Sequence, residues 1–408
     1  MNPTELFRAS LRAIKAHTLR SFLTLLGVII GVATIVAVVG VISGLNTYVK
    51  EKIIVLAPDV FIIEKFGIIR SHKEFLQAVK RPPISWTEYE RLSSGILQHA
   101  SQLSAAAGTA MPVNNGDKRL PDIVVIGATA NFSDLFRLEF ESGRFFSDSE
   151  NQASHPVAVI GADTKDELFP HLDPVGRILL LRGLPFRIIG VMPKQGRTIG
   201  FSQDSRVYIP LQVYRKNFMP ANQSLQLHIK AEGGVEGLDA AQDEVRALFR
   251  AMRHTPFRSP DPFGILTQES LQQLWKAISS AAFVLLMLIS SVSLGVGGIV
   301  IMNIMLVSVV ERTQEIGVRM ALGAKKRDIR RQFLLEAALL SAAGGVIGVL
   351  VGTAGAFLVK YLSGFPAQIT PGIVFTGIFV STLVGLAAGF LPAYRASNLV
   401  IIDAIRAE

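Results

Sequence analysis

The chain has no cysteine among its 408 residues. Disulfide bonds, thiolate metal sites and cysteine nucleophiles are therefore excluded. The dipeptide Gly-Lys is also absent, so there is no phosphate-binding loop of the GxxxxGK(S/T) kind, whose lysine must reach the nucleotide phosphates. Neither an HExxH zinc motif nor a GxSxG nucleophile motif occurs. We expect no catalytic residue, no cofactor site and no metal site in this chain.

Charge is missing from four long stretches, at 21–49, 277–310, 337–359 and 361–394. A helix rises about 1.5 Å per residue, so about 20 residues cross a ~30 Å hydrocarbon core. Pro366 and Pro371 prevent one helix through the last stretch. The sequence predicts membrane spans at 21–44, 277–310, 337–359 and 372–391.

Residues 1–20 are predicted to form an amphipathic helix along the membrane lipid. Phe7, Leu11 and Ile14 share one face, with basic residues beside them. A cleaved signal peptide is the alternative for this end of the chain. The apolar core at 22–41 is longer than the about 7 to 15 residues typical of one, which favours a retained span.

The basic residues indicate the orientation. The loop 311–336 has seven Lys or Arg against four Asp or Glu, and residues 1–20 have four against one. Short basic segments stay in the cytoplasm, so we expect both termini, the loop 311–336 and the tail 392–408 inside. The segments 45–276 and 360–371 then lie outside. Because 45–276 has 27 basic and 25 acidic residues, the net charge of +9 reflects topology, and no nucleic-acid partner is expected.

The segment 45–276 is predicted to be an α+β domain, with two subdomains and stalk-like ends. Short β-branched runs predict strands, and Arg182-Gly183 predicts a hairpin turn. The predicted strands are 60–64, 123–127, 157–161, 178–181 and 186–191, and the predicted helices are 86–98 and 238–254. Thr267 and Ser270 indicate the start of another helix that continues into 277–310. It would be a stalk of about 45 residues, roughly 65 Å long.

Glycines four residues apart recur in the apolar stretches. Such spacing lets helix backbones approach closely, either within the chain or in a dimer. The alternative is that glycine is simply common in membrane helices. The residues are Gly27, Gly31, Gly344, Gly348, Gly352, Gly385 and Gly389.

The loop 311–336 is predicted to contain a short amphipathic helix over 312–322. Ile316 and Met320 share one face, while Glu315 and Arg319 pair on another. Gly323 is suited to end the helix, and Asp328 to begin the next. Lys325, Lys326 and Arg327 could merely anchor the loop to lipid headgroups. The mixed charge equally suits docking into a protein cleft.

The same loop resembles the ERTREIGIRxALGA…QFLxEA signature of MacB/FtsX-type ABC transporter permeases. It has ERT at 311–313, EIGVR at 315–319, ALGA at 321–324 and QFLLEA at 332–337. PAYRA at 392–396 is similar to the closing PAxRA of the family, although Ile402-Asp403 replaces the usual Pro-(V/I)-Glu. Segments similar to the MacB-type periplasmic core domain are NF at 131–132, SGRFF at 142–146, VAVIG at 157–161, DPVGR at 173–177 and IGVM at 189–192.

The resemblance implies a permease subunit in a bacterial inner membrane, paired with a second permease subunit and two ATPase subunits that bind ATP and magnesium. It implies that motion passes from the ATPase through the loop helix to the external domain, without cargo crossing the bilayer. MacB has its ATPase fused before the first span, so we expect a separate ATPase chain here. A periplasmic adaptor and an outer-membrane channel are further possible partners.

The resemblance also assigns the loop residues a role in coupling to the ATPase: Glu311, Arg312, Glu315, Ile316, Gly317, Arg319, Met320 and Gly323. Export is the leading interpretation. Lipoprotein release from the outer leaflet and FtsX-like signalling to a cell-wall hydrolase are the alternatives.

Overall fold

The computed structural model describes residues 18–50, 56–95, 97–198, 201–363, 366–401 and 404. Most of the amphipathic helix predicted at 1–20, and most of the closing segment 402–408, lie outside the described residues. The chain divides into two units. We call Met1–Val49 with Ala277–Glu408 the membrane unit, and Lys50–Lys276 the inserted unit.

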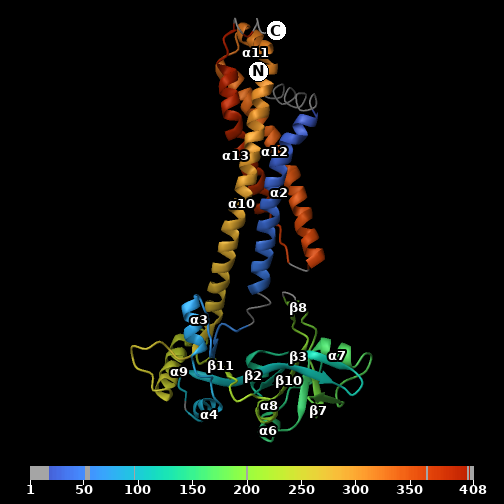
Figure 1. Ribbon diagram of the computed structural model, residues 1–408, viewed down its shortest axis with the longest axis vertical. Coiled ribbons are helices and arrows are strands. Elements are labelled where there is room, and N and C mark those ends of the chain that lie inside the picture. The colour runs from blue at the N-terminus through green and yellow to red at the C-terminus, as the bar shows by residue number, and fades with distance from the viewer. Residues whose placement is uncertain are drawn as a thin grey trace. The chain divides into compact units, whose positions relative to one another are not determined.

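Four helices of the described chain are long and apolar enough to cross a membrane. They are α2 (Thr18–Tyr48), α10 (Gln268–Glu311), α12 (Lys326–Ser363) and α13 (Pro371–Ser397). Within the membrane unit, α12 packs against both α2 and α13 (Figure 1). Each helix extends beyond the span predicted for it, because hydropathy marks only the apolar part of a helix.

The ends of α12 and α13 differ most from the prediction. Helix α12 begins at Lys326, inside the segment predicted as a loop, because Ile329 and Phe333 are buried at 2% exposure and hold this turn in place. Helix α13 continues through Pro392 to Ser397. Ala393 and Ala396 are fully buried there, so packing stabilises a helix that proline alone would interrupt.

Helix α10 is continuous over 44 residues, about 66 Å at 1.5 Å per residue, which is twice a hydrocarbon core. The long helix predicted from the sequence is present. Its start is fixed by a reciprocal cap, in which the Ser270 N–H donates to Thr267 Oγ1 at 3.0 Å and the Thr267 N–H donates to Ser270 Oγ at 2.9 Å. Caps of this kind satisfy backbone donors that the first turn leaves unpaired.

The inserted unit is built on one ten-stranded mixed sheet with the order β12-β1-β11-β2-β3-β10-β5-β7-β4, while β6 pairs with β2 and β7. The strands are β1 (Val60–Glu64), β2 (Ala100–Asn114), β3 (Arg119–Ala128), β4 (Ser142–Gly143), β5 (Val157–Ile160), β6 (Ile178–Leu181), β7 (Leu184–Val191), β10 (Arg206–Pro210), β11 (Gln226–Ala231) and β12 (Gly264–Thr267). A separate hairpin joins β8 (Arg197–Thr198) and β9 (Phe201–Ser202). The β6–β7 turn has Arg182 and Gly183 at φ 47° and 87°, as a tight hairpin requires.

The sheet has an apolar cluster on each face. On one face, α8 (Leu211–Asn217) and α9 (Leu238–Met252) bury Tyr214 and Phe249. On the other, α5 (Phe132–Leu135) buries Phe132. The remaining helices are α3 (His72–Val79), α4 (Trp86–Ser94), α6 (Asp148–Gln152) and α7 (Ala162–Leu168). Two subdomains were expected, whereas a single sheet runs through the whole unit (Figure 1).

Candidate functional site

The candidate site is the short helix α11 (Thr313–Ala321) between α10 and α12. Helix α10 ends at Glu311, and Arg312 turns the chain. The Thr313 hydroxyl donates to the carbonyls of Val309 and Val310 at 3.0 and 2.8 Å. These bonds satisfy carbonyls that the end of α10 leaves free, so the turn into α11 is well defined.

The other end of α11 is a complete Schellman motif. The Gly323 N–H donates to the Met320 carbonyl and the Ala324 N–H to the Arg319 carbonyl, both at 3.1 Å. Gly323 has φ +96°, a left-handed conformation that glycine adopts without a steric penalty. The Lys325 N–H then donates to Asp328 Oδ2 at 3.3 Å, which caps the start of α12. The glycine stop and the aspartate start predicted from the sequence are both present.

The inner face of α11 is apolar. Ile316 is 3% exposed and Gly317 is buried. Ile316 belongs to a cluster with Val309 of α10, and with Ile329 and Phe333 of α12. The buried face thus holds α11 to the helices on both sides of it.

Polar contacts tie the same helix to α12. Arg319 donates to Gln332 Oε1 at 2.9 Å and also pairs with Glu315, one turn earlier on α11. Arg312 Nη1 lies 3.3 Å from Glu336 Oε1. Gln332 and Glu336 are one helical turn apart and are 7% and 5% exposed. Charge-assisted bonds to buried acceptors are stronger than neutral ones, so α11 and the first turns of α12 form one block.

The outer face of α11 contains residues that the sequence analysis did not select. Val318 is 45% exposed and Leu322 is 84% exposed. They lie four residues apart, so they share a face. The sequence shows their spacing of four residues, but only the fold shows that they are exposed.

The predicted coupling residues therefore divide into two groups. Glu311, Glu315 and Gly323 are exposed. The other five are buried or half-buried: Arg312, Ile316, Gly317, Arg319 and Met320. Three of these five hold α11 on α12: Ile316 through apolar contacts, and Arg312 and Arg319 through polar contacts with Glu336 and Gln332. The role of the eight residues in coupling stays a prediction.

The last turns of α13 join this block. Lys326 Nζ donates to Asn398 Oδ1 at 3.0 Å, just beyond the end of α13. The Arg330 guanidinium lies 5.4 Å from the centroid of the Tyr394 ring, within cation–π range. The block thus includes residues of the PAYRA segment.

All seven predicted packing glycines lie at contacts between helices of this chain. A Cβ on Gly27 would lie 2.8 Å from Gly297 Cα of α10, and one on Gly31 would lie 3.1 Å from Leu294 Cα. Gly344, Gly348 and Gly352 of α12 meet α2. Gly385 and Gly389 of α13 meet Ser341 and Ala337 of α12. Small residues at these positions let the helix backbones approach closely.

Four membrane helices, a large unit inserted between the first and second, and a short connecting helix between the second and third define a multi-pass membrane protein of the permease class. Residues 21–248 match the MacB-like periplasmic core domain, and residues 287–401 match the FtsX-like permease C-terminal domain. The chain belongs to the MacB/FtsX family of ABC transporter permeases. The inserted unit is accordingly its extracytoplasmic α/β domain.

Relatives match over nearly the whole chain. The uncharacterized ABC transporter permease YknZ of Bacillus subtilis is 30% identical, with 100% of each chain covered. The macrolide export ATP-binding/permease protein MacB of Neisseria gonorrhoeae is 32% identical over 98% of this chain and 60% of its own length. The chain thus spans about three fifths of the MacB relatives that it matches. The crystal structure of the periplasmic region of MacB from Actinobacillus actinomycetemcomitans has a TM-score of 0.45 at 16% identity, covering 55% of this chain and 96% of that one.

Proposed function

We propose that this chain is the membrane subunit of an ABC transporter and that α11 receives the motion of an ATPase partner. The single observation that carries the proposal is the two-sided character of α11. Its inner face is fixed to α12 through Ile316 and Arg319, while its outer face presents Val318 and Leu322. A fixed helix with an exposed apolar pair is suited to bind a partner and pass on the force.

The path of the motion follows from covalent and packing continuity. Helix α11 joins directly to α10, which is continuous over 44 residues and begins at the end of the inserted unit. A movement of α11 would therefore act on α10, and through it on the extracytoplasmic domain. Among the described residues, the four membrane helices hold no Asp, Glu, Lys, Arg or His within the apolar stretches, which favours mechanical coupling over an ion path.

The orientation supports the same function. The basic loop 311–336 and the basic segment 1–20 favour the cytoplasmic side. ATP is available there, so the ATPase would meet α11. The ATPase activity would belong to a partner subunit, with a second permease subunit completing the transporter.

The test is purification of the tagged chain from its host membrane, followed by measurement of ATP hydrolysis in the eluate. Leu322→Asp places a charge on the proposed contact and should remove at least about 90% of the associated activity, since desolvating one charge at an interface costs more than the roughly 1.4 kcal/mol that a tenfold loss requires. Leu172→Asp is the matched control, because Leu172 is 49% exposed in the inserted unit.

Retention of the ATPase by Leu322→Asp would contradict the proposal, as would hydrolysis by the chain alone. The identity of the molecule that stimulates ATP hydrolysis would distinguish export from lipoprotein release and signalling. A drug or peptide is the expected outcome for export. Stimulation by an acylated protein would instead indicate lipoprotein release, and association with a cell-wall hydrolase would indicate signalling.

A further inference from the structure

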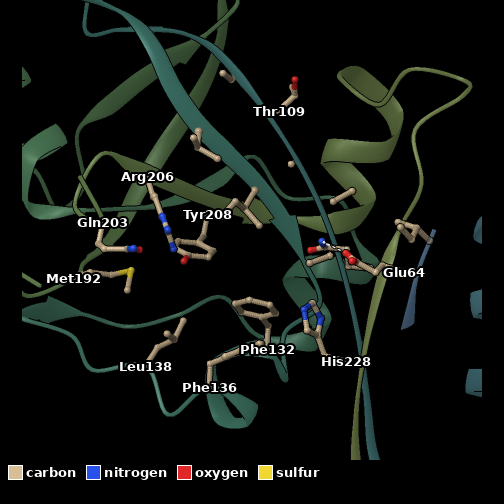
Figure 2. Close-up of a pocket in the computed structure, with 18 of the residues that line it drawn as sticks. Glu64, Thr109, Phe132, Phe136, Leu138, Met192, Gln203, Arg206, Tyr208 and His228 are labelled. Atoms are coloured by element: carbon tan, nitrogen blue, oxygen red, sulfur yellow. Dashed lines mark hydrogen bonds between the residues drawn. The ribbon is translucent and has the colours of Figure 1, made fainter. Parts of the chain in front are cut away.

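The inserted unit has a cleft of about 1110 Å³ on the face of the sheet opposite α8 and α9 (Figure 2). Its floor is formed by neighbouring strands. Arg206 of β10 is paired in register with Val124 of β3, which is paired with Ala110 of β2. Two residues further along β10, Tyr208 is paired with Ile126 of β3, which is paired with Gly108 of β2. The small residues of β2 leave the space above the floor open, and the sheet makes the site rigid.

One wall of the cleft is aromatic. Phe132 and Phe136 lie 4.4 Å apart between ring centroids. The His228 ring meets both of them edge-on, at 5.4 and 5.1 Å. Tyr208 lies 5.9 Å from Phe132 and extends the apolar surface toward β10. An apolar ring or chain would find a continuous surface here.

His228 places a buried polar ring in the cleft wall. It is 4% exposed, and its Nδ1 has no hydrogen-bond partner among the described residues. Burial lowers the pKa of this imidazole to about 3, so the ring is neutral and offers one donor and one acceptor. Buried polar atoms without partners are rare in folded proteins and call for an explanation.

The charges in the cleft favour an anion. Among the described residues, the lining has four cations against two carboxylates: Lys65, Arg137, Lys194 and Arg206 against Glu64 and Glu139. Glu64 is already engaged, since it accepts from Gln226 Nε2 at 3.0 Å and from the Gly67 N–H at 3.2 Å. Within the part of the chain that the structure describes, the half-buried Arg206 has no carboxylate partner. In Figure 2 its side chain lies between Gln203 and Tyr208.

We propose that this cleft binds an amphipathic organic anion, whose apolar ring or chain lies against Phe132 and Phe136 and whose carboxylate, sulfonate or phosphate meets Arg206. A guanidinium can bind such a group through two parallel hydrogen bonds. The cleft volume of about 1110 Å³ is slightly above the roughly 300 to 1,000 Å³ typical of small-molecule sites, so a drug-sized molecule fits. The site belongs to the inserted unit and does not depend on the role of α11.

The experiment uses the full chain in nanodiscs of zwitterionic lipid at neutral pH, without an ATPase. Binding of 2-naphthoate and of its neutral counterpart 2-naphthamide is measured by equilibrium dialysis, with empty nanodiscs subtracted. The carboxylate should bind about tenfold more tightly than the amide, as one charge-assisted contact provides. Since no ATPase is present, failure of the coupling proposal would leave this result unchanged.

The variants separate charge from shape. Arg206→Gln should bring the two affinities within about threefold of each other, Arg206→Lys should keep a preference for the anion, and Phe136→Ala should weaken both ligands. Ala110→Leu fills the exposed floor and should also weaken both, which gives a second test that leaves Arg206 intact. Arg187→Gln is the control, because Arg187 is an exposed strand cation outside the cleft.

Four results would overturn the proposal. The native chain could bind the amide as tightly as the carboxylate, which would indicate a site for neutral apolar molecules. The preference for the anion could persist in folded Arg206→Gln. Saturable binding of both probes could be absent from the native chain, or unaffected by Ala110→Leu.

Discussion

Arg312 Nη1 lies 3.3 Å from Oε1 of Glu336, which joins the turn after α10 to the third turn of α12. The Glu336 side chain is 6% exposed and that of Arg312 is 28% exposed. Arg312 precedes α11 and Glu336 follows it in α12. The pair therefore joins the segments on either side of α11 and fixes the position of the helix between them.

Removing either charge of this pair should destabilise the membrane unit. We expect Arg312→Gln and Glu336→Gln each to cost about 1 to 3 kcal/mol, since the first leaves the buried Glu336 and the second the half-buried Arg312 without its charged partner. The double variant should cost less than the sum of the two. The measurement is the midpoint of unfolding in mild detergent. Glu141→Gln is the control for an exposed ion pair with Lys165 and should cost below about 1 kcal/mol. Additive losses would show that the two side chains act independently.

The end of α11 should depend on Gly323. An alanine at φ +96° should destabilise the turn by about 1 to 2 kcal/mol, the penalty for a left-handed L-residue. The exposed Lys325 and Lys326 would then be cleaved faster by trypsin. Gly355→Ala is the control, since an added Cβ there meets no described residue within 4 Å. Equal cleavage rates for Gly323→Ala and the native chain would refute the role of this glycine.

The crossing of α2 and α10 should depend on Gly27. Gly27→Leu would push a side chain against Gly297 Cα, because even a Cβ added at Gly27 would lie only 2.8 Å from that atom. The substitution should therefore separate the two helices. Because the chain has no cysteine, Leu294→Cys provides a unique thiol at a site 4% exposed. We expect Gly27→Leu to increase maleimide labelling of that thiol. Gly295→Leu, with open space around it, should leave the labelling low.

His228 should make the stability of the inserted unit depend on pH. Its pKa is lowered to about 3 by burial, against about 6.5 in the unfolded chain. Between these values the unfolded state binds more protons, so stability falls as pH falls below about 6.5, by up to about 1.4 kcal/mol per pH unit. His228→Phe should flatten this slope in unfolding measurements. The exposed His155→Phe should leave it unchanged, and an unaltered slope in His228→Phe would contradict the assignment.

Local patterns in the sequence determined much of the fold. The strand predicted at 60–64 is β1 without change. Arg182-Gly183 forms the expected hairpin turn, and Thr267 with Ser270 begins the expected long helix. Each of these depends on residues close together in the chain, whose backbone preferences and hydrogen bonds act locally.

Several predicted spans were shorter than the helices that contain them. Hydropathy detects only the apolar part of a helix, whereas α12 begins at the charged residue Lys326. The loop helix itself was expected, but its contact surface was not. Periodicity divides α11 into faces and does not say which face finds Ile329 and Phe333. Val318 and Leu322 became candidates only when the fold left them exposed.

The sequence by itself determined the four apolar spans, the basic connection between the second and third, and the glycine that ends α11, since hydropathy, charge and backbone freedom are properties of single residues and their near neighbours. Only the tertiary structure decided which helix each glycine contacts and that Arg312 reaches Glu336. It also decided the cleft, where strand pairing brings Glu64, Ala110, Arg206 and His228 onto one face. Contacts between residues so distant in the chain depend on packing, which no local pattern encodes.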